Sequence, residues 1–335
     1  MIPQSSQIHD PQNVSSLAIV LEAPERVELR EVALGEPAAS DVLVALEWSG
    51  ISTGTERLLF SGEMPPFPGL GYPLVPGYES VGRVVHAGPE SGRAVGQHVF
   101  VPGSAGFQEV RGLFGGAASH LLAPGARTVS IEEGLGQRGV LLALAATAVH
   151  ALRTGREGAV DLGESPVLIV GHGALGRLLA RCVIAAGGQP PVVWEKLASR
   201  RAGKFDYPVI DPGDDDRYDY GLIFDVSGDA ASIDGLIARL APRGSLVLAG
   251  FYRDPIRFDF PPAFMREARI RIAAEWEPRD IEVASQWVAQ DWLSLDDLVT
   301  HVTHVGRADD ARSAYQTAFE DSTCIKMVLD WRNAQ

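Results

Sequence analysis

Three glycines and one acid have the spacing of a dinucleotide-binding loop. Gly171, Gly173 and Gly176 form a G-x-G-x-x-G pattern directly after an apolar run, and Glu195 ends the next apolar run. In such a loop the first glycine makes the turn, the second lets the backbone approach a pyrophosphate, and the third lets the following helix pack on the strand. The helix N-terminus adds positive potential, and the acid accepts a hydrogen bond from the ribose 2′-hydroxyl. The pattern therefore predicts dinucleotide binding.

The acid also indicates which dinucleotide binds. A carboxylate at this position repels a 2′-phosphate, so NAD is favoured over NADP. Lys196, Arg200 and Arg201 follow closely and could attract a phosphate, but we expect them on a solvated helix face. His172 is expected at the solvent edge near the phosphates and not as a catalyst. The predicted cofactor-binding residues are Gly171, His172, Gly173, Ala174, Leu175, Gly176 and Glu195.

The loop lies within an alternating pattern of strands and helices. A continuous apolar strand at 166–170, a helical run at 174–186 and a second strand at 191–195 make one βαβ unit, which requires a parallel sheet. The same alternation continues through residues 222–228, 230–240, 244–250 and 269–274. This part is predicted to be α/β, a doubly wound parallel-sheet Rossmann domain at 153–290.

The preceding part of the chain has short β runs instead. Between Leu17 and Ile131 they are broken by Gly, Pro and Asp, as in a small barrel or sandwich. The stretch 61–72, SGEMPPFPGLGY, is apolar but too rich in turn residues for regular structure, and it could cover a pocket. Residues 139–153 are rich in Ala and Leu without a breaker, which predicts a buried or linker helix.

Length and charge restrict the class of protein. A chain of 335 residues indicates about two domains. The net charge of −14 argues against a nucleic-acid partner. The two cysteines, Cys182 and Cys324, are expected to be reduced core residues, which fits a cytoplasmic protein. Residues 1–16 are predicted to be a loose tail, with neither a signal peptide nor a membrane span.

Several motifs resemble those of the medium-chain dehydrogenase/reductase family. The stretch 115–124, GGAASHLLAP, is similar to the family's G-G-x-A-E-Y-x-x-x-P, and 95–101, VGQHVFV, is similar to its G-D-R-V-V-V. Residues 297–331 are similar to its closing strand, helix and strand. The resemblance implies a GroES-like β domain, formed by 17–152 and 291–335, which binds substrate and carries the catalytic residues.

Zinc-dependent members of this family carry a Cys, a His-Glu pair and a third Cys or Glu. Here Ser52 stands where the Cys would be and Tyr78 where the His would be, while the helix near Ala143 offers only Ala and Leu. A catalytic zinc needs three thiolate, imidazole or carboxylate ligands. We therefore expect no metal site, with Glu79 as the retained acid of the pair. With only two cysteines, the chain also lacks the family's four-Cys structural zinc lobe.

Within the family, residues 52–85 and 110–127 resemble the members that act on a bacteriochlorin pigment. The resemblance implies NAD-dependent oxidation of the 3-(1-hydroxyethyl) group of bacteriochlorophyllide, a magnesium tetrapyrrole, to 3-acetyl. One departure from generic dehydrogenases lies in 195–224, where an acidic turn replaces the usual helix between the third and fourth Rossmann strands.

Without zinc, another group must take part in alcohol oxidation. Our hypothesis is that the conjugated macrocycle delocalises the positive charge that builds up as hydride departs, so the protein supplies orientation and a proton acceptor. The candidate catalytic residues are Ser52, Thr53, Thr55, Tyr78 and Glu79, with Tyr78 or a hydroxyl relay touching Glu79 preferred.

Each of these residues also has a purely structural alternative. Glu79 could instead pair with Arg57 or Arg83. His150 is expected to be a satisfied core histidine and not a proton shuttle, and His120 a packing residue.

A flat tetrapyrrole requires aromatic walls and a cation at the rim of its pocket. Arg57 or Arg111 could meet the pigment's carboxylate. The candidate wall residues are Phe60, Met64, Phe67, Tyr72, Phe107 and Phe114. Any one of these side chains could instead simply pack the small domain.

Two other functions stay open. A zinc-free quinone or enone reductase of the same superfamily would prefer NADPH, which Glu195 opposes. A non-enzymatic pigment carrier would keep the nucleotide fold without turnover. The sequence leaves the oligomeric state open, with a homodimer as one option because relatives commonly dimerise. Peripheral contact with a photosynthetic membrane is also left open, although no basic amphipathic helix supports it.

Overall fold

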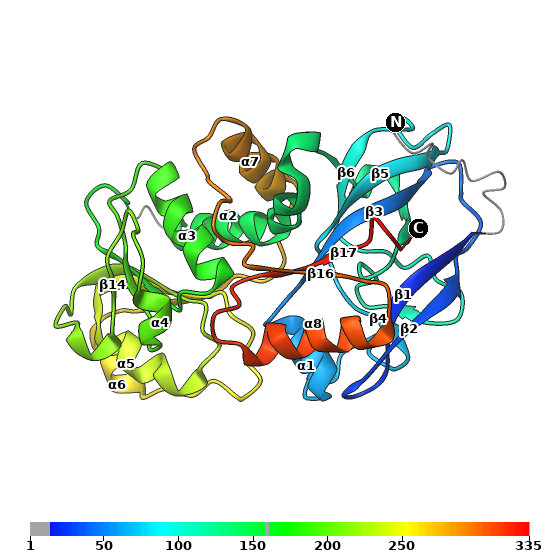
Figure 1. Cartoon of the computed structure of the whole chain (residues 1–335). Helices are drawn as coiled ribbons and strands as arrows, with labels where there is room; N and C mark the ends of the chain where they lie inside the picture. The colour runs from blue at the N-terminus through cyan, green and yellow to red at the C-terminus, as the bar shows by residue number, and fades with distance from the viewer. Residues whose placement is uncertain (1–13, 158–160, 335) are drawn as a thin grey trace. The chain divides into compact units, whose positions relative to one another are not determined.

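The computed structural model describes residues 14–157 and 161–334 (Figure 1). The chain divides into two compact units. The first unit comprises Met1–Leu141 and Asp297–Gln335, and the second comprises Leu142–Asp296. Most of the predicted loose tail lies outside the described residues, but Ser15 and Ser16 already belong to the first strand.

The first unit is built on two β-sheets. The larger one has the order β16-β17-β3-β5-β6-β9, with β8 also pairing with β3. Its strands are β3 (Asp41–Ile51), β5 (Ser80–Ala87), β6 (His98–Val101), β8 (His120–Pro124), β9 (Val129–Ser130), β16 (His301–His304) and β17 (Met327–Asp330). Because β17 pairs antiparallel with β3, the end of the chain completes a sheet that the first third began.

The smaller sheet has the order β2-β1-β4-β7. Its strands are β1 (Ser15–Ala23), β2 (Arg26–Ala33), β4 (Leu74–Val75) and β7 (Arg111–Gly112). One apolar core fills the unit and includes Ile19, Leu46 and Trp331. The expected β domain is confirmed. The stretch 61–72 has no helix or strand except Ser61, the last residue of α1.

Two α-helices accompany these sheets. α8 (Ala308–Glu320) is amphipathic and buries Ala311, Ala314, Tyr315 and Ala318, a spacing that places them on one face. α1 (Thr55–Ser61) was not expected from the sequence. It ends at Gly62, whose φ of 74° is the left-handed conformation that glycine adopts readily. Short 3₁₀ turns occur at η1 (Gly125–Arg127) and η2 (Glu133–Leu141).

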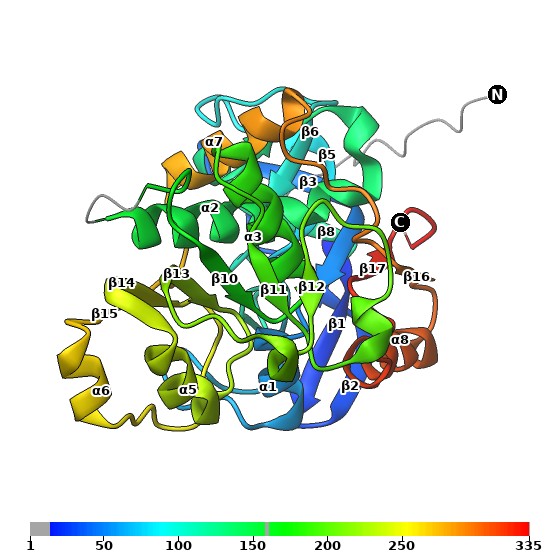
Figure 2. The same cartoon turned by 90° about the vertical axis from the view of Figure 1, so that its left-hand side faces the viewer.

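The second unit contains one parallel sheet with the order β12-β11-β10-β13-β14-β15 (Figure 2). Its strands are β10 (Val167–Val170), β11 (Val192–Trp194), β12 (Val209–Ile210), β13 (Tyr220–Asp225), β14 (Leu240–Leu248) and β15 (Arg269–Ile272). In chain order this is 3-2-1-4-5-6, the arrangement of dinucleotide-binding sheets. The predicted doubly wound fold is confirmed.

Helices cover both faces of this sheet (Figure 2). They are α2 (Leu142–Arg156), α3 (Ala174–Ala185), α4 (Ala198–Arg201), α5 (Ile233–Ala238), α6 (Phe260–Met265) and α7 (Pro278–Ala289), with 3₁₀ turns η3 (Pro212–Asp214) and η4 (Ala230–Ser232). Between β12 and β13 only η3 occurs, so the predicted replacement of a helix by an acidic turn is confirmed. The expected helix at 139–153 is displaced, because 133–141 forms 3₁₀ turns.

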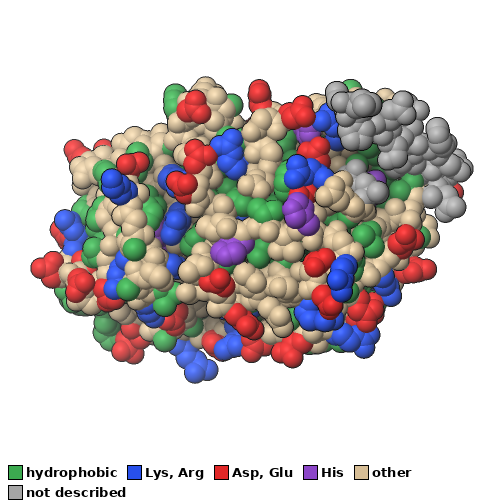
Figure 3. Space-filling view, viewed as in Figure 1, with side chains coloured by type: hydrophobic (Ala, Val, Ile, Leu, Met, Phe, Trp, Pro, Cys, Tyr) green, Lys and Arg blue, Asp and Glu red, His purple; other side chains and the backbone are tan. Residues whose placement is uncertain are grey.

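Two features bear on contact with membranes and nucleic acids: the burial of one apolar helical run and the distribution of surface charge. The run Glu133–Arg156 is long and apolar enough to cross a membrane by composition, but 61% of its most apolar window is buried inside the structure. Such burial is usual for the core helix of a folded domain. On the face drawn in Figure 3, acidic and basic side chains of the described residues are interspersed and form no basic cluster.

Candidate active site

The glycine loop of the second unit has the geometry that a bound pyrophosphate requires. Gly171 has a φ of 106°, and a Cβ on Gly176 would lie 1.9 Å from the Gly171 carbonyl oxygen. A Cβ on Gly173, in contrast, would meet nothing within 4 Å. The first and third glycines are thus required by the fold, while the second leaves open space beside the start of α3. The loop fits a dinucleotide.

Glu195 lies immediately after β11 and is held against this loop. Its Oε2 accepts a hydrogen bond from the His172 backbone N–H at 3.3 Å, and its Oε1 accepts one from the Leu197 N–H at 2.9 Å. The side chain is almost fully buried. The carboxylate therefore lies beside the loop, where the adenosine ribose of a bound dinucleotide is expected. The geometry suits the predicted role of Glu195, which stays a prediction.

The neighbouring cations are engaged with other groups. Lys196 Nζ lies 3.2 Å from Asp229 Oδ2. Arg201 donates to the carbonyl oxygens of Glu195 and Lys196, each at 2.8 Å, and to Asp211 Oδ2 at 2.9 Å. Lys196 and Arg201 are therefore both engaged with groups of the second unit.

The expectation that His172 lies at the solvent edge is wrong. Its side chain is fully buried, because residues 200–207 fold back over it. The imidazole Nδ1 lies 2.9 Å from the Arg200 carbonyl oxygen, and Nε2 lies 3.1 Å from the Tyr207 hydroxyl. Ala174 is also buried, and Leu175 is half-buried. The loop therefore presents its backbone and not its side chains.

In the first unit, three of the candidate catalytic residues form a hydroxyl cluster. Ser52 Oγ and the Tyr78 hydroxyl lie 2.7 Å apart, and the Thr55 side chain also hydrogen-bonds to Tyr78. Burial raises the pKa of Tyr78 well above its ordinary value, and the negative charge of Glu79 raises it further. Tyr78 is therefore a neutral phenol that can donate or relay a proton but does not act as a simple base. Thr53 is exposed beside this cluster.

The carboxylate of Glu79 forms a buried ion pair with a lysine. Both groups are buried, and Lys326 Nζ lies 2.9 and 2.7 Å from the two carboxylate oxygens. The ammonium also donates to the Ile51 carbonyl oxygen at 3.2 Å. A carboxylate held in this way is a fixed charge and not a free proton acceptor. The sequence signal for Lys326 was a single cation directly before the apolar closing strand.

The alternative expectation was that Glu79 pairs with Arg57 or Arg83. It is wrong, because the ion-pair partner of Glu79 is Lys326. Arg83 lies 3.0 Å from Glu133 Oε1. Arg57 donates to the Phe319 carbonyl oxygen, and its guanidinium lies 5.6 Å from the centre of the Phe319 ring. Both arginines therefore serve other contacts.

Glu56 is a buried acid that the sequence analysis missed. Its Oε1 accepts a hydrogen bond from the Ser52 backbone N–H and its Oε2 accepts one from the Tyr315 hydroxyl, both at 2.8 Å. Burial raises the pKa of Glu56 to about 7, and Glu79 also raises it, while the two hydrogen bonds and Lys326 oppose the shift. The sequence signal that could have identified Glu56 is its position, four residues after the candidate Ser52.

The donor set at the former ligand positions does not fit zinc. The hydroxyls of Ser52 and Tyr78 are bonded to each other, and the carboxylate of Glu79 is bonded to Lys326. Among the residues that the structure describes, no three His, Cys, Asp or Glu side chains are grouped as a metal site. Hydroxyls of Ser and Tyr are poor zinc ligands beside thiolate and imidazole.

Some predicted substrate residues are exposed, and one of them contacts the hydroxyl cluster. The Phe114 ring meets the Tyr78 ring edge-on, with the centroids 5.6 Å apart. Phe114 and Phe67 are exposed, as is Arg111 on β7. A Cβ on Gly71 would lie 3.1 Å from the Arg111 guanidinium carbon, so the loop after α1 passes beside this cation.

Other predicted substrate residues are directed into the core of the first unit. Met64 and Phe107 are buried there. Phe60 packs against Tyr315 and Phe319, with ring centroids 6.1 and 5.4 Å apart. The Tyr72 hydroxyl donates to the Leu59 carbonyl oxygen. These side chains hold the 62–73 loop in place.

The two other histidines of the sequence analysis have satisfied partners. His150 Nδ1 lies 2.8 Å from Asp280 Oδ2, and Asp280 also accepts from Arg153. Burial lowers the pKa of His120, whose Nδ1 lies 3.1 Å from Ser119 Oγ. Both contacts fit structural roles.

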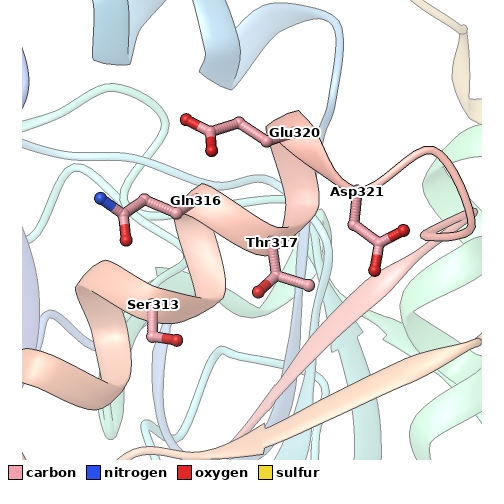
Figure 4. A pocket seen from close by; sticks show the side chains of 5 residues that line it. All are labelled: Ser313, Gln316, Thr317, Glu320 and Asp321. Atoms are coloured by element: carbon pink, nitrogen blue, oxygen red, sulfur yellow. The ribbon is translucent and has the colours of Figure 1, made fainter.

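A hollow of about 350 Å³ lies along α8, away from these clusters in sequence (Figure 4). It is lined by Ser313, Gln316, Thr317, Glu320 and Asp321. None of these residues was a candidate from the sequence, and the polar lining with two carboxylates does not suit a flat apolar substrate.

Comparison with known proteins decides the family. Residues 38–133 match the alcohol dehydrogenase GroES-like domain. The chain is 52% identical to the 2-desacetyl-2-hydroxyethyl bacteriochlorophyllide A dehydrogenase of Cereibacter sphaeroides, over 94% of this chain and 98% of the relative. The chain belongs to this family of dehydrogenases. The enzyme of the same name from Rhodobacter capsulatus is 50% identical over 95% of this chain and 98% of its own length.

Solved structures confirm the fold of this dehydrogenase family member. The 2R,3R-butanediol dehydrogenase of Bacillus subtilis has a TM-score of 0.81 at 18% identity, covering 94% of this chain and 99% of its own. Acetophenone reductase from Geotrichum candidum in complex with NAD has a TM-score of 0.78 at 19% identity, covering 96% and 98%. At such identities the likeness establishes the architecture alone.

The buried carboxyl of Glu56 predicts how stability depends on pH. Because its pKa rises from 4.5 to about 7 on folding, the folded state binds the proton more tightly, so stability falls as pH rises from about 4.5 through 7. This pKa shift corresponds to about 3 kcal/mol in the free energy of unfolding. Glu56→Gln removes the charge, keeps an oxygen that accepts from the Ser52 N–H, and places an amide N–H that can donate to the Tyr315 hydroxyl oxygen. It should raise the free energy of unfolding at pH 8 by about 2 to 3 kcal/mol, with little effect at pH 4.5.

Denaturant unfolding at several pH values measures this difference. The exposed Glu36 provides the matched control, since Glu36→Gln should leave stability unchanged at each pH. Equal stabilisation by Glu56→Gln at pH 4.5 and 8 would contradict the raised pKa.

Proposed function

We propose that this chain oxidises the 3-(1-hydroxyethyl) group of bacteriochlorophyllide a to 3-acetyl, with NAD as hydride acceptor and without a zinc ion. The observation that carries the proposal is identity of 50% or more, over nearly the whole chain, to two dehydrogenases named for this substrate. The hydroxyl cluster at the former ligand positions supports the zinc-independent part.

The second unit supplies the NAD site in this proposal. The open side of Gly173 and the N-terminus of α3 would receive the pyrophosphate, and Glu195 would accept from the ribose hydroxyl. When bound, the nicotinamide ring accepts the hydride from the substrate carbon. The engaged side chains of Lys196 and Arg201 support NAD over NADP.

The first unit supplies the path for the hydroxyl proton. As a neutral phenol, Tyr78 can take the substrate's proton only while passing its own to Ser52 Oγ, 2.7 Å away. From Ser52 the proton passes to solvent beside the exposed Thr53 and Thr55 turn. Glu79 takes no proton in this scheme, because Lys326 neutralises it. The conjugated macrocycle delocalises the positive charge that develops as hydride leaves.

Exposed side chains of the first unit, one of them in contact with Tyr78, suit a flat pigment with a carboxylate. Phe114, which contacts the Tyr78 ring, and Phe67 provide apolar surface. Arg111 on β7 is the cation that we assign to the propionate. Arg57 is committed to Phe319, so Arg111 is the better of the two predicted cations.

We also propose that this cytoplasmic enzyme is a homodimer, formed through β15. This strand ends the parallel sheet, and beside it α6 exposes Phe260, Phe264 and Met265. Met265 and Ile272 are 76% and 75% exposed. An apolar hollow of about 520 Å³ is lined by Phe260, Phe264 and Met265 of α6 and by Ile270 of β15. An open strand edge beside apolar surface favours pairing with a second copy.

Oligomeric state provides a direct measurement. The wild-type chain should have the mass of a dimer in light scattering, and Met265→Glu with Ile272→Lys should yield a monomer that keeps its fold. A wild-type monomer that sediments with anionic vesicles through this patch would contradict the dimer and favour peripheral membrane contact.

Turnover with defined cofactors tests the main proposal. Incubation of the chain with 3-hydroxyethyl bacteriochlorophyllide a and NAD should shift the pigment's red absorption as the acetyl group joins the conjugated system. The rate should be much lower with NADP and should not change after chelation or on addition of zinc. Activity that vanishes on chelation would overturn the zinc-free mechanism. NAD binding without turnover would favour a carrier, and C=C reduction with NADPH a reductase.

Removing the Tyr78 hydroxyl should slow the chemical step. We expect Tyr78→Phe to lower kcat about 100-fold or more with little change in KM, because general acid–base groups contribute roughly 10²–10⁴. Ser52→Ala should produce a loss of similar size, since the two hydroxyls act in series. Steady-state kinetics measure both, with Tyr218→Phe at an exposed tyrosine as the control. Unchanged kcat in Tyr78→Phe would remove the relay.

A further inference from the structure

His172 lies at the centre of a buried cluster beneath the glycine loop. Its ring meets the Phe205 and Tyr207 rings edge-on, with centroids 4.6 and 5.8 Å away. The Arg177 guanidinium lies over the Phe205 ring at 5.2 Å. These residues come from the loop, from α3 and from the segment after α4, so the cluster joins three separate parts of the second unit.

The hydrogen-bond partners determine the tautomer of His172. The Arg200 carbonyl oxygen can only accept, so Nδ1 carries the proton and donates to it at 2.9 Å. Nε2 then has a lone pair and accepts from the Tyr207 hydroxyl at 3.1 Å. Burial lowers the pKa of His172 to about 4, so the ring is neutral at working pH and both hydrogen bonds are made.

The backbone of the same residue contacts Glu195. The His172 N–H donates to Glu195 Oε2 at 3.3 Å, and the His172 carbonyl oxygen accepts from Arg177 Nε at 3.2 Å. One residue therefore holds the carboxylate with its main chain and the 200–207 segment with its side chain. That segment begins within the short α4, whose Arg201 donates to the Glu195 carbonyl oxygen at 2.8 Å.

We propose that His172 is a positioning residue for cofactor selectivity, which ties residues 200–207 to the glycine loop and thereby fixes Glu195 where it rejects a 2′-phosphate. The inference rests on the proposed binding of NAD. Accepting NADP would require Glu195 to leave both of its backbone N–H donors and a nearby arginine to turn inward. Both movements require the segment that His172 holds to shift.

Three variants separate selectivity from general packing. His172→Leu fills the space but removes both side-chain hydrogen bonds. His172→Asn keeps a donor near the Nδ1 position, and Tyr207→Phe keeps the stacked ring while removing only the contact to Nε2. The control is His150→Leu, which breaks the contact with Asp280 elsewhere in the same unit. It should lower stability without changing selectivity.

Binding of NADH and NADPH to the full chain, followed by nicotinamide fluorescence, gives the readout. We expect His172→Leu to lower the ratio of the NADPH to the NADH dissociation constant by about tenfold. His172→Asn should keep a ratio near that of the wild type. The ratio for Tyr207→Phe should lie between those of the wild type and His172→Leu. This ratio is insensitive to a uniform loss of binding, which a purely structural role would cause.

The outcomes distinguish this inference from the function on which it rests. Wild-type binding of NADH with an unchanged ratio in His172→Leu and Tyr207→Phe would overturn the role of His172 and leave the dehydrogenase proposal intact. If His172→Leu does not fold, an unchanged ratio in Tyr207→Phe alone overturns it. Failure of the wild-type chain to bind either nucleotide would overturn both.

Discussion

The buried ion pair between Glu79 and Lys326 is the contact on which the candidate catalytic region depends. Lys326 directly precedes β17, and Glu79 directly precedes β5, so the pair joins the last strand of the chain to the central sheet of the first unit. Removing one partner would leave an uncompensated buried charge, which typically destabilises by about 3–5 kcal/mol. The pair also touches the Ile51 carbonyl oxygen, one residue before Ser52. It thereby fixes both chain segments that carry the hydroxyl cluster.

Around this pair, the candidate site has neutral hydroxyls and a paired carboxylate at the positions where zinc-dependent members of the family carry ligands. Tyr78 stays protonated because it is buried beside a carboxylate, and Ser52 gives it a partner for proton relay. Glu56 holds the backbone of Ser52 from the other side and is itself bound by Tyr315 of α8. Each hydroxyl therefore has a defined position, which is what a proton relay requires of its scaffold.

In the second unit, a departure from the usual helix pattern is offset by side-chain packing. The turn η3 stands where the usual helix would lie between β12 and β13. In the segment before it, Arg201 bonds to Asp211, and Arg200 and Tyr207 bond to His172. The segment beside the cofactor is therefore held by polar and aromatic contacts. We propose that, through these contacts, residues that do not touch the nucleotide influence the choice between NAD and NADP.

The sequence by itself determined the features that depend on local pattern. The strand–helix–strand alternation predicted the parallel sheet, and the glycine spacing with Glu195 predicted its loop. The residue types at Ser52 and Tyr78, compared with the family's ligand positions, gave the expectation of no zinc site, which stays a prediction. The short β runs predicted the first unit, and the Pro- and Gly-rich stretch after α1 predicted an irregular loop. These features follow from periodicity, turn chemistry and ligand chemistry, which a single segment contains.

Only the tertiary structure decided which partner each polar side chain has. Lys326 meets Glu79, and Tyr315 meets Glu56, across more than two hundred residues of chain. His172 is buried because a later segment folds over it, and Met64 and Phe60 are directed into the core. Burial and long-range hydrogen bonds set the pKa of Glu56, Tyr78 and His172. Such contacts depend on how distant strands and helices pack, which local spacing does not contain.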